Sequence, residues 1–83
     1  MQYMVIERFK AGNATAVYDR FAQKGRMLPD GLHYIDSWLT ADDRTCFQVM
    51  ETDQPESFDK WTCHWNDLVD FEIIELKEKP TGD

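Results

Sequence analysis

The first residues of the chain divide into two alternating sets of side chains that suit the two faces of a β-strand. The alternation covers residues 2–9, and both faces hold apolar groups: Tyr3, Val5, Glu7 and Phe9 on one, Met4, Ile6 and Arg8 on the other. A helix over residues 14–24 is predicted next, because Asn13 is a favourable N-cap and Gly25 a favourable left-handed stop. The expected inner face of this helix consists of Ala14, Val17, Tyr18 and Phe21.

The middle of the chain predicts a β-hairpin. It begins after the turn Pro29-Asp30-Gly31, where proline presets φ and glycine accepts a positive φ. A strand over residues 32–39 follows, and the polar turn at residues 40–43 connects it to a strand over residues 45–51. In the first of these strands Leu32, Tyr34, Asp36 and Trp38 are expected on one face, and His33, Ile35, Ser37 and Leu39 on the other.

Asp53 is predicted to cap a second helix, with Pro55 in its first turn and Glu56 placed three residues after the cap in the manner of a capping box. Its large apolar residues recur at the spacing of one helical face, which predicts that they are buried: Phe58, Trp61, Thr62 and Trp65. The last strand is expected over residues 69–76, again with apolar side chains of both parities. Residues 77–83 are expected to form a frayed tail.

These elements follow the order βαββαβ, which predicts a ferredoxin-like α+β fold. Right-handed crossovers place both helices on one face of a four-stranded antiparallel sheet. Because the first and last strands are apolar on both sides, the second face of the sheet also needs a cover. We expect a homodimer in which two copies pack through their sheet faces about a two-fold axis.

Composition and charge narrow the class of protein. The chain of 83 residues is expected to form a single domain over residues 1–76, and a domain of this size buries only about 60–65% of its unfolded surface, so association would stabilise it. Nine basic and sixteen acidic residues give a net charge of −7, which predicts no binding to nucleic acid or anionic membranes. No signal-peptide pattern or membrane-length apolar run occurs in the sequence, and we expect a soluble, cytoplasmic protein.

Six blocks of the sequence resemble a family of short bacterial proteins of unknown function in the dimeric α/β-barrel superfamily. The blocks are MVIERFK at 4–10, GRMLPDGL at 25–32, Asp36-Ser37-Trp38, CFQVMETD at 46–53, the pair Trp61 and Trp65, and DLVDFE at 67–72. The resemblance implies two sheets paired into a barrel, with a cleft in each subunit. The superfamily includes cofactor-independent monooxygenases, isomerases and haem-degrading enzymes. The fold alone therefore does not indicate which of these functions the chain has.

The haem-degrading members use a histidine on the second helix and an asparagine on the first strand. His64 matches the first of these positions, but the first-strand positions hold Val5, Ile6 and Glu7. No phosphate-binding loop, dinucleotide fingerprint or nucleophile elbow occurs either. Cys46 and Cys63, the only two cysteines, are too few for a closed zinc site or a disulfide scaffold. We therefore expect no cofactor and no metal.

Three residues are candidates for acid–base catalysis. Glu7 and Glu51 lie within or at the end of central strands, where burial would raise the pKa of a carboxyl group and suit it to act as a general base. The alternative is that both lie near a rim and meet solvent, Arg8 or Arg44. His33, near the start of the second strand, is the third candidate because histidine transfers protons near neutral pH. Its alternative is a surface position at a strand end.

Trp38 and Gln48 are candidates for ligand binding. In a pocket they would supply an aromatic wall and a hydrogen-bonding amide, and in a dimer interface they would fill space between the sheets. His64 and Cys63 are expected at the surface of the second helix, away from its apolar face.

Two functions follow from these patterns. One is a non-catalytic homodimer that binds a small apolar or aromatic molecule in a cleft. The other is a cofactor-independent monooxygenase or isomerase that uses Glu7, Glu51 or His33 as its base. The absence of acid–base residues at a recognisable spacing favours the first, whereas a strongly shifted carboxyl pKa in a cleft would favour the second.

Overall fold

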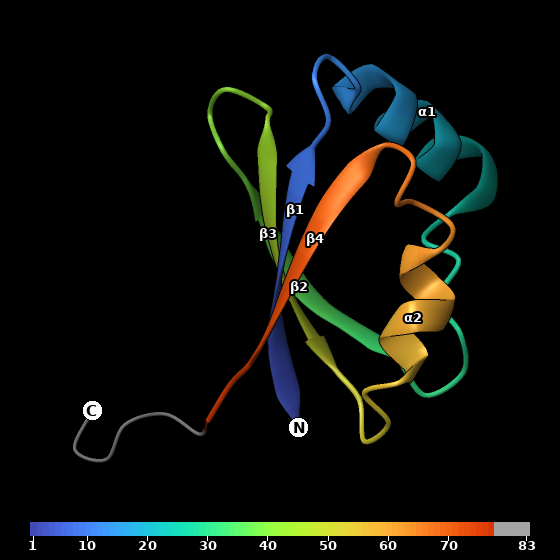
Figure 1. Cartoon of the computed structure of the whole chain (residues 1–83), viewed down its shortest axis with the longest axis vertical. Helices are drawn as coiled ribbons and strands as arrows, with labels where there is room; N and C mark the ends of the chain where they lie inside the picture. Colours follow the sequence, from blue (N-terminus) through green and yellow to red (C-terminus); the bar gives the residue numbers. More distant parts are fainter. Residues whose placement is uncertain (78–83) are drawn as a thin grey trace.

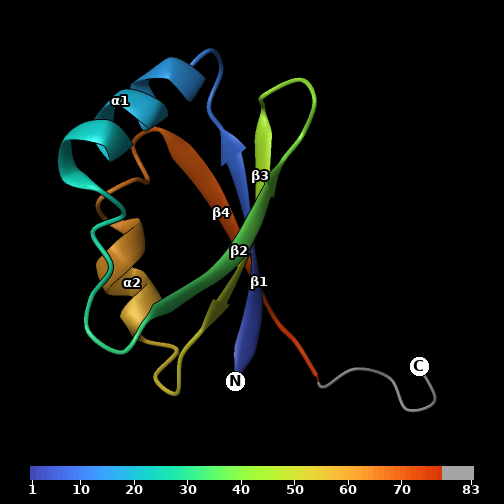
Figure 2. The ribbon, with the colours of Figure 1, turned by 180° about the vertical axis from the view of Figure 1, so that it is seen from behind.

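A computed structural model describes residues 1–77. The elements are β1 (Gln2–Phe9), α1 (Ala14–Lys24), β2 (His33–Leu39), β3 (Thr45–Glu51), α2 (Ser57–Thr62) and β4 (Val69–Glu75). The strands form one antiparallel sheet in the order β2-β3-β1-β4, and both helices lie on the same side of it (Figure 1, and from behind Figure 2). The predicted ferredoxin-like βαββαβ fold is confirmed. The tail expected at residues 77–83 lies, after Lys77, outside the described residues.

The core lies between the sheet and the segment that contains α2. Tyr3 packs edge-on against Phe58, with ring centroids 5.1 Å apart, and Trp61 packs against Phe71 at 5.3 Å. The predicted burial of the three aromatic residues of the α2 face is confirmed, although α2 ends at Thr62 and Trp65 lies in the turns that follow. The buried hydrophobic residues are Tyr3, Val5, Val17, Leu32, Met50, Phe58, Trp61, Trp65 and Val69.

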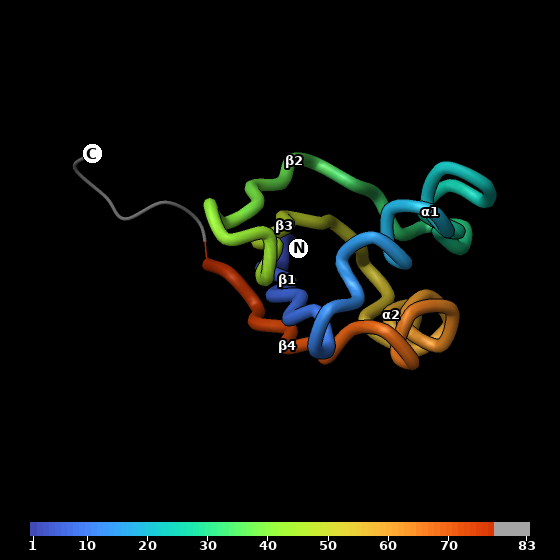
Figure 3. The backbone as a smooth tube through the Cα atoms, turned by 90° about the horizontal axis from the view of Figure 1, so that it is seen from above, coloured from blue at the N-terminus to red at the C-terminus, as the bar shows by residue number. Residues whose placement is uncertain are grey.

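Helix α1 has its predicted bounds but packs less closely than expected. Its C-terminal stop is confirmed, because Gly25 has a φ of 68° and donates its N–H to the Phe21 carbonyl at 2.7 Å. Of the predicted inner face, only Val17 is buried, whereas Tyr18 and Phe21 are 46% and 40% exposed. Viewed from above, α1 and α2 lie side by side over the sheet (Figure 3). The aromatic side chains of α1 therefore border a space and do not close on the core.

The predicted start of the second helix is wrong. Asp53 is exposed and does not cap α2, and the helix begins at Ser57 without a side-chain hydrogen bond from its N-cap. The preceding turn is instead held by two hydroxyl groups: Thr52 Oγ1 accepts the Gln54 N–H at 3.0 Å, and Ser57 Oγ donates to the Gln54 carbonyl at 2.7 Å. Side-chain hydrogen bonds of this kind compete with a capping box because they fold the same short segment into a local turn, here around the backbone N–H and carbonyl of Gln54.

A β-bulge in β2 corrects the expected alternation of residues 32–39. Tyr34 lies opposite Met50, but Asp36, and not Ile35, lies opposite Val49. Ile35 is the extra residue, so every later side chain in β2 changes face relative to a regular strand. Ser37 therefore points to the helix side of the sheet, and Trp38 points to the opposite side.

The side of the sheet opposite the helices is apolar along its centre, and we call it the open face. Trp38 on β2 and Phe47 on β3 are cross-strand neighbours there and are 55% and 36% exposed. Ile74 on β4 is 41% exposed. The two-sided apolar character predicted for the first and last strands is thus observed. The apolar residues of the open face are Met4, Ile6, Trp38, Phe47, Val49 and Ile74.

Candidate functional site

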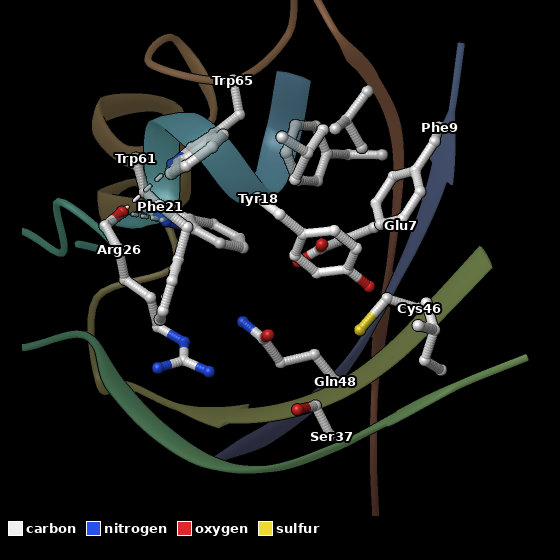
Figure 4. Close-up of a pocket in the computed structure, with 14 residues that line it drawn as sticks. Glu7, Phe9, Tyr18, Phe21, Arg26, Ser37, Cys46, Gln48, Trp61 and Trp65 are labelled. Atoms are coloured by element: carbon white, nitrogen blue, oxygen red, sulfur yellow. Dashed lines mark hydrogen bonds between the residues drawn. The ribbon is translucent and has the colours of Figure 1, made fainter. Parts of the chain in front are cut away.

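A cavity of about 230 Å³ lies between the two helices and the helix side of the sheet (Figure 4). It exists because Tyr18 and Phe21 of α1 stand over the sheet without filling the space beneath them. Trp61 and Trp65 close one side, and all four strands contribute to the floor. The walls are mostly apolar and aromatic, and a few polar side chains point inward. This is the usual composition of a small-molecule site.

Glu7 is the buried acid of the cavity. It lies on β1 with the core-facing residues and is only 9% exposed. Burial raises the pKa of its carboxyl group from 4.5 to about 7, and the positive charge of Arg26 opposes this rise. Among residues 1–77, no group forms a hydrogen bond or ion pair with this carboxyl. Every fully enclosed side-chain oxygen and nitrogen in that range has a partner, so the Glu7 oxygens must be reached from the cavity.

Residues on the neighbouring strand complete the polar part of the floor. Cys46 lies opposite Glu7 in the β1–β3 register, and burial, together with the Glu7 charge, raises the pKa of its thiol to about 11. Gln48 is buried, and its Nε2 donates to the Met50 sulfur at 3.2 Å. Ser37 shares a hydroxyl–hydroxyl hydrogen bond of 2.7 Å with Tyr34. The bulge in β2 thus supplies a small polar residue to the floor where a regular strand would have placed a larger one.

Arg26 is a site residue that sequence reasoning did not single out. Its backbone carbonyl accepts the indole N–H of both Trp61 and Trp65, each at 3.0 Å. Its guanidinium carbon lies 3.7 Å from the centroid of the Tyr34 ring and 4.9 Å from that of Phe21. Figure 4 shows the guanidinium and the Gln48 amide pointing into the same space. A buried tryptophan N–H needs an acceptor, but sequence alone does not indicate which carbonyl supplies it.

The other predicted site residues lie elsewhere. His33 and Glu51 are exposed cross-strand partners and border a separate shallow hollow near Asp53. Glu51 lies opposite Gln2 of β1, far along the strand from Glu7, so the structure does not bring the two carboxylates together. Trp38 lies on the open face and does not line the cavity, whereas Gln48 does.

The alternative prediction, that a carboxylate lies near a rim and meets solvent, describes Glu51, which is exposed, but not Glu7, which is buried. Arg8, one of the two expected partners, points to the open face and forms an ion pair with Glu72 at 3.0 Å.

His64 and Cys63 are exposed, as expected. Within residues 1–77, no group of three or more histidine, cysteine or acidic side chains is placed to hold a metal ion. In the same range, no helix has the length and apolar character needed to cross a membrane.

Comparison with known proteins identifies a family but no activity. A family model described as "Domain of unknown function (DUF3303)" matches residues 1–76. No curated protein matches the chain. The chemistry of the cavity is therefore the basis for a functional proposal.

Proposed function

The chain belongs to the DUF3303 family of domains of unknown function, and we propose that it is a non-catalytic binding protein for a small apolar or aromatic molecule. The observation that carries the proposal is the cavity between the helices and the sheet, with its aromatic walls. A ring placed there contacts Trp61, Trp65 and Phe71 and removes apolar surface from water. Gln48 and Glu7 then orient it through hydrogen bonds.

A neutral probe tests the binding proposal without involving charge. We expect 2-naphthamide, titrated into the protein and followed by ¹H–¹⁵N NMR, to shift the signals of cavity residues and of the two tryptophan indole N–H groups. Ser37→Phe, which fills the floor, should weaken binding at least tenfold, whereas the matched control Ser37→Ala should bind as the parent does. Shifts confined to the open face, or equal affinities of the two variants, would contradict the proposal.

Catalytic proton transfer is a second candidate function, and one observation favours it. Glu7 has a pKa of about 7, so near neutral pH a large share of molecules carries an ionised carboxylate in an apolar site. Such a base removes a proton from the α-carbon of a β,γ-unsaturated carbonyl compound, leaving a dienolate, and returns the proton to the γ-carbon, so that the double bond moves to the α,β position. The substrate is isomerised, no electrons leave it, and no cofactor is consumed. This reaction corresponds to the isomerase function, one of the two enzymatic functions expected from the sequence.

The proton-transfer candidate is tested by hydrogen–deuterium exchange. We expect 2-tetralone, a ketone with acidic α-hydrogens, to exchange them in D₂O faster with the parent protein than with Glu7→Gln. Glu51→Gln is the matched control because Glu51 lies outside the cavity. Equal exchange rates with the parent and with Glu7→Gln would exclude the proton-transfer function and leave the binding function alone.

The proposal extends to a cytoplasmic homodimer joined through the open faces. A second copy is favoured as the cover because the same apolar face on both molecules is self-complementary about a two-fold axis. A small domain also gains by burying more surface. The resemblance to short bacterial proteins of the dimeric α/β-barrel superfamily supports the same assembly. Two cysteines without a disulfide suit a reducing compartment.

A further inference from the structure

Arg26 is a cation held in place from several directions. It follows the left-handed Gly25, and its carbonyl is fixed by the two tryptophan N–H groups. Its guanidinium lies over the Tyr34 ring and near the Phe21 ring. Both ring faces attract a cation and also limit where it lies. The positive charge is thus positioned at the cavity before any ligand enters.

This positive charge has no anionic partner among residues 1–77. Arg8 and Arg20 form ion pairs with Glu72 and Asp67 in the same range, but Arg26 forms none. Other basic side chains, such as Arg44 and Lys60, also form no ion pair within this range, but they are exposed, whereas Arg26 is half-buried at the cavity. Glu7, whose pKa is raised by burial and lowered in part by the charge of Arg26, forms no ion pair with it. A half-buried guanidinium beside an apolar cavity therefore retains unused hydrogen-bond donors.

Resting on the proposed function, we infer that the ligand is a planar, mostly apolar monoanion whose acidic group lies between Arg26 and Glu7. A carboxylate or enolate oxygen accepts hydrogen bonds from the guanidinium, and the ring lies among the tryptophans. The neutral form of Glu7 donates a second hydrogen bond to the same anionic group. An organic cation is disfavoured by Arg26, and a second negative charge on the ligand would lack a partner because Arg26 is the one basic side chain among the described residues that line the cavity.

The test compares two probes of equal shape, 2-naphthoate and 2-naphthamide, by calorimetry at pH 7. We expect the parent to bind the anion at least tenfold more tightly than the amide. Arg26→Met removes the charge but keeps an apolar stem and the backbone carbonyl, and it should abolish this preference. Arg44→Met is the matched control, because it removes one exposed charge from the β2–β3 turn. It should retain the preference.

A second measurement uses the parent protein, so that it does not depend on the folding of a variant. The titratable groups at the cavity are Glu7, Cys46 and Tyr18, with Arg26 as the fixed charge. At pH 7.5 an entering anion should favour the neutral form of Glu7. Calorimetry in two buffers of different ionisation enthalpy should then show proton uptake with naphthoate, no uptake with the amide, and none with Glu7→Gln.

Each outcome decides between the two proposals. Equal or tighter binding of the amide by the parent overturns the anion inference and leaves the cavity proposal standing. Retention of the preference in Arg26→Met, or naphthoate binding without proton uptake, also overturns the inference. If neither probe binds the parent, both proposals fall.

Discussion

Trp61 and Trp65 share one hydrogen-bond acceptor, since both indole N–H groups donate to the carbonyl of Arg26. The shared contact joins the α2 segment to the chain that links α1 to β2. Both indoles are also buried, with 3% and 5% of their surface exposed. The same two side chains therefore support the core, close one wall of the cavity and fix the backbone of Arg26, the cationic residue that lines the cavity.

We expect Trp61→Ala and Trp65→Ala each to lower the free energy of unfolding by about 3–5 kcal/mol, as truncation of a buried aromatic side chain does. Trp61→Phe keeps most of the buried area and loses one hydrogen bond, so its cost should be nearer 1 kcal/mol. Urea unfolding and thermal melting at a fixed protein concentration measure the stability of all three variants. Melting temperatures of both alanine variants within a few degrees of the parent would mean that the α2 segment is not seated as described.

The pKa of Glu7 makes stability depend on pH. The folded state binds a proton that the unfolded chain releases between pH 4.5 and about 7, so stability should fall as pH rises through this window. The full effect is roughly 3 kcal/mol. Glu7→Gln, which removes the ionisation, should gain stability relative to the parent as pH rises from 5 to 8.

Two measurements check this pH dependence. Unfolding curves across the same range should show no relative gain for Glu51→Gln, whose side chain is exposed. Direct NMR titration of the Glu7 carboxyl should give a midpoint near 7. A midpoint at or below 4.5 would exclude both the proton-transfer candidate and the stability effect.

The two cysteines should differ in reactivity. Cys63 is exposed, whereas Cys46 is half-buried in the cavity wall with a thiol pKa of about 11. Only roughly one Cys46 thiol in a thousand is therefore ionised at pH 8, and the thiolate is the reactive form. Iodoacetamide followed by mass spectrometry should label Cys63 first. Bound naphthoate should slow Cys46 further and leave Cys63 unchanged. Equal labelling rates would contradict the burial of Cys46 and the raised pKa of its thiol.

A charge on the open face should separate the proposed dimer. Phe47→Glu places an ionised group where two copies are expected to meet, and burying that group without a partner is unfavourable. We expect sedimentation to show a dimer for the parent at micromolar concentration and a monomer for Phe47→Glu. Ala16→Glu adds the same charge on the exposed side of α1 and should remain dimeric. A monomeric parent would remove the dimer proposal.

The sequence predicted the elements well because their signals are local. The period-two division of their side chains located β1 and β4, and Gly25 marked the end of α1. The start of α2 was missed because Thr52 and Ser57 organise the turn that the capping box was expected to occupy. Within the described residues, the architecture thus followed from periodicity, whereas one boundary depended on competing side-chain hydrogen bonds.

The site was less predictable because its parts are joined by distant contacts. Glu7 was a candidate, but its burial depends on both helices lying over β1. Arg26 was missed because its partners, Trp61 and Trp65, lie 35 and 39 residues away along the chain. Trp38 was expected in a pocket or an interface, and no glycine or proline near Ile35 signals the bulge that turns it to the open face.

The bulge at Ile35 determines the register in which the rest of the edge strand β2 pairs with β3. If Ile35 entered the ladder, Asp36 would lie opposite Gln48 and Trp38 opposite Cys46. A carboxylate and an indole would then occupy the cavity, and the open face would lose its largest aromatic side chain. Deleting Ile35, by contrast, leaves every observed pairing in register. One extra residue in a single strand therefore determines which side chains face the cavity and which lie on the open face. A change at this position would alter the ligand cavity and the proposed dimer surface at the same time.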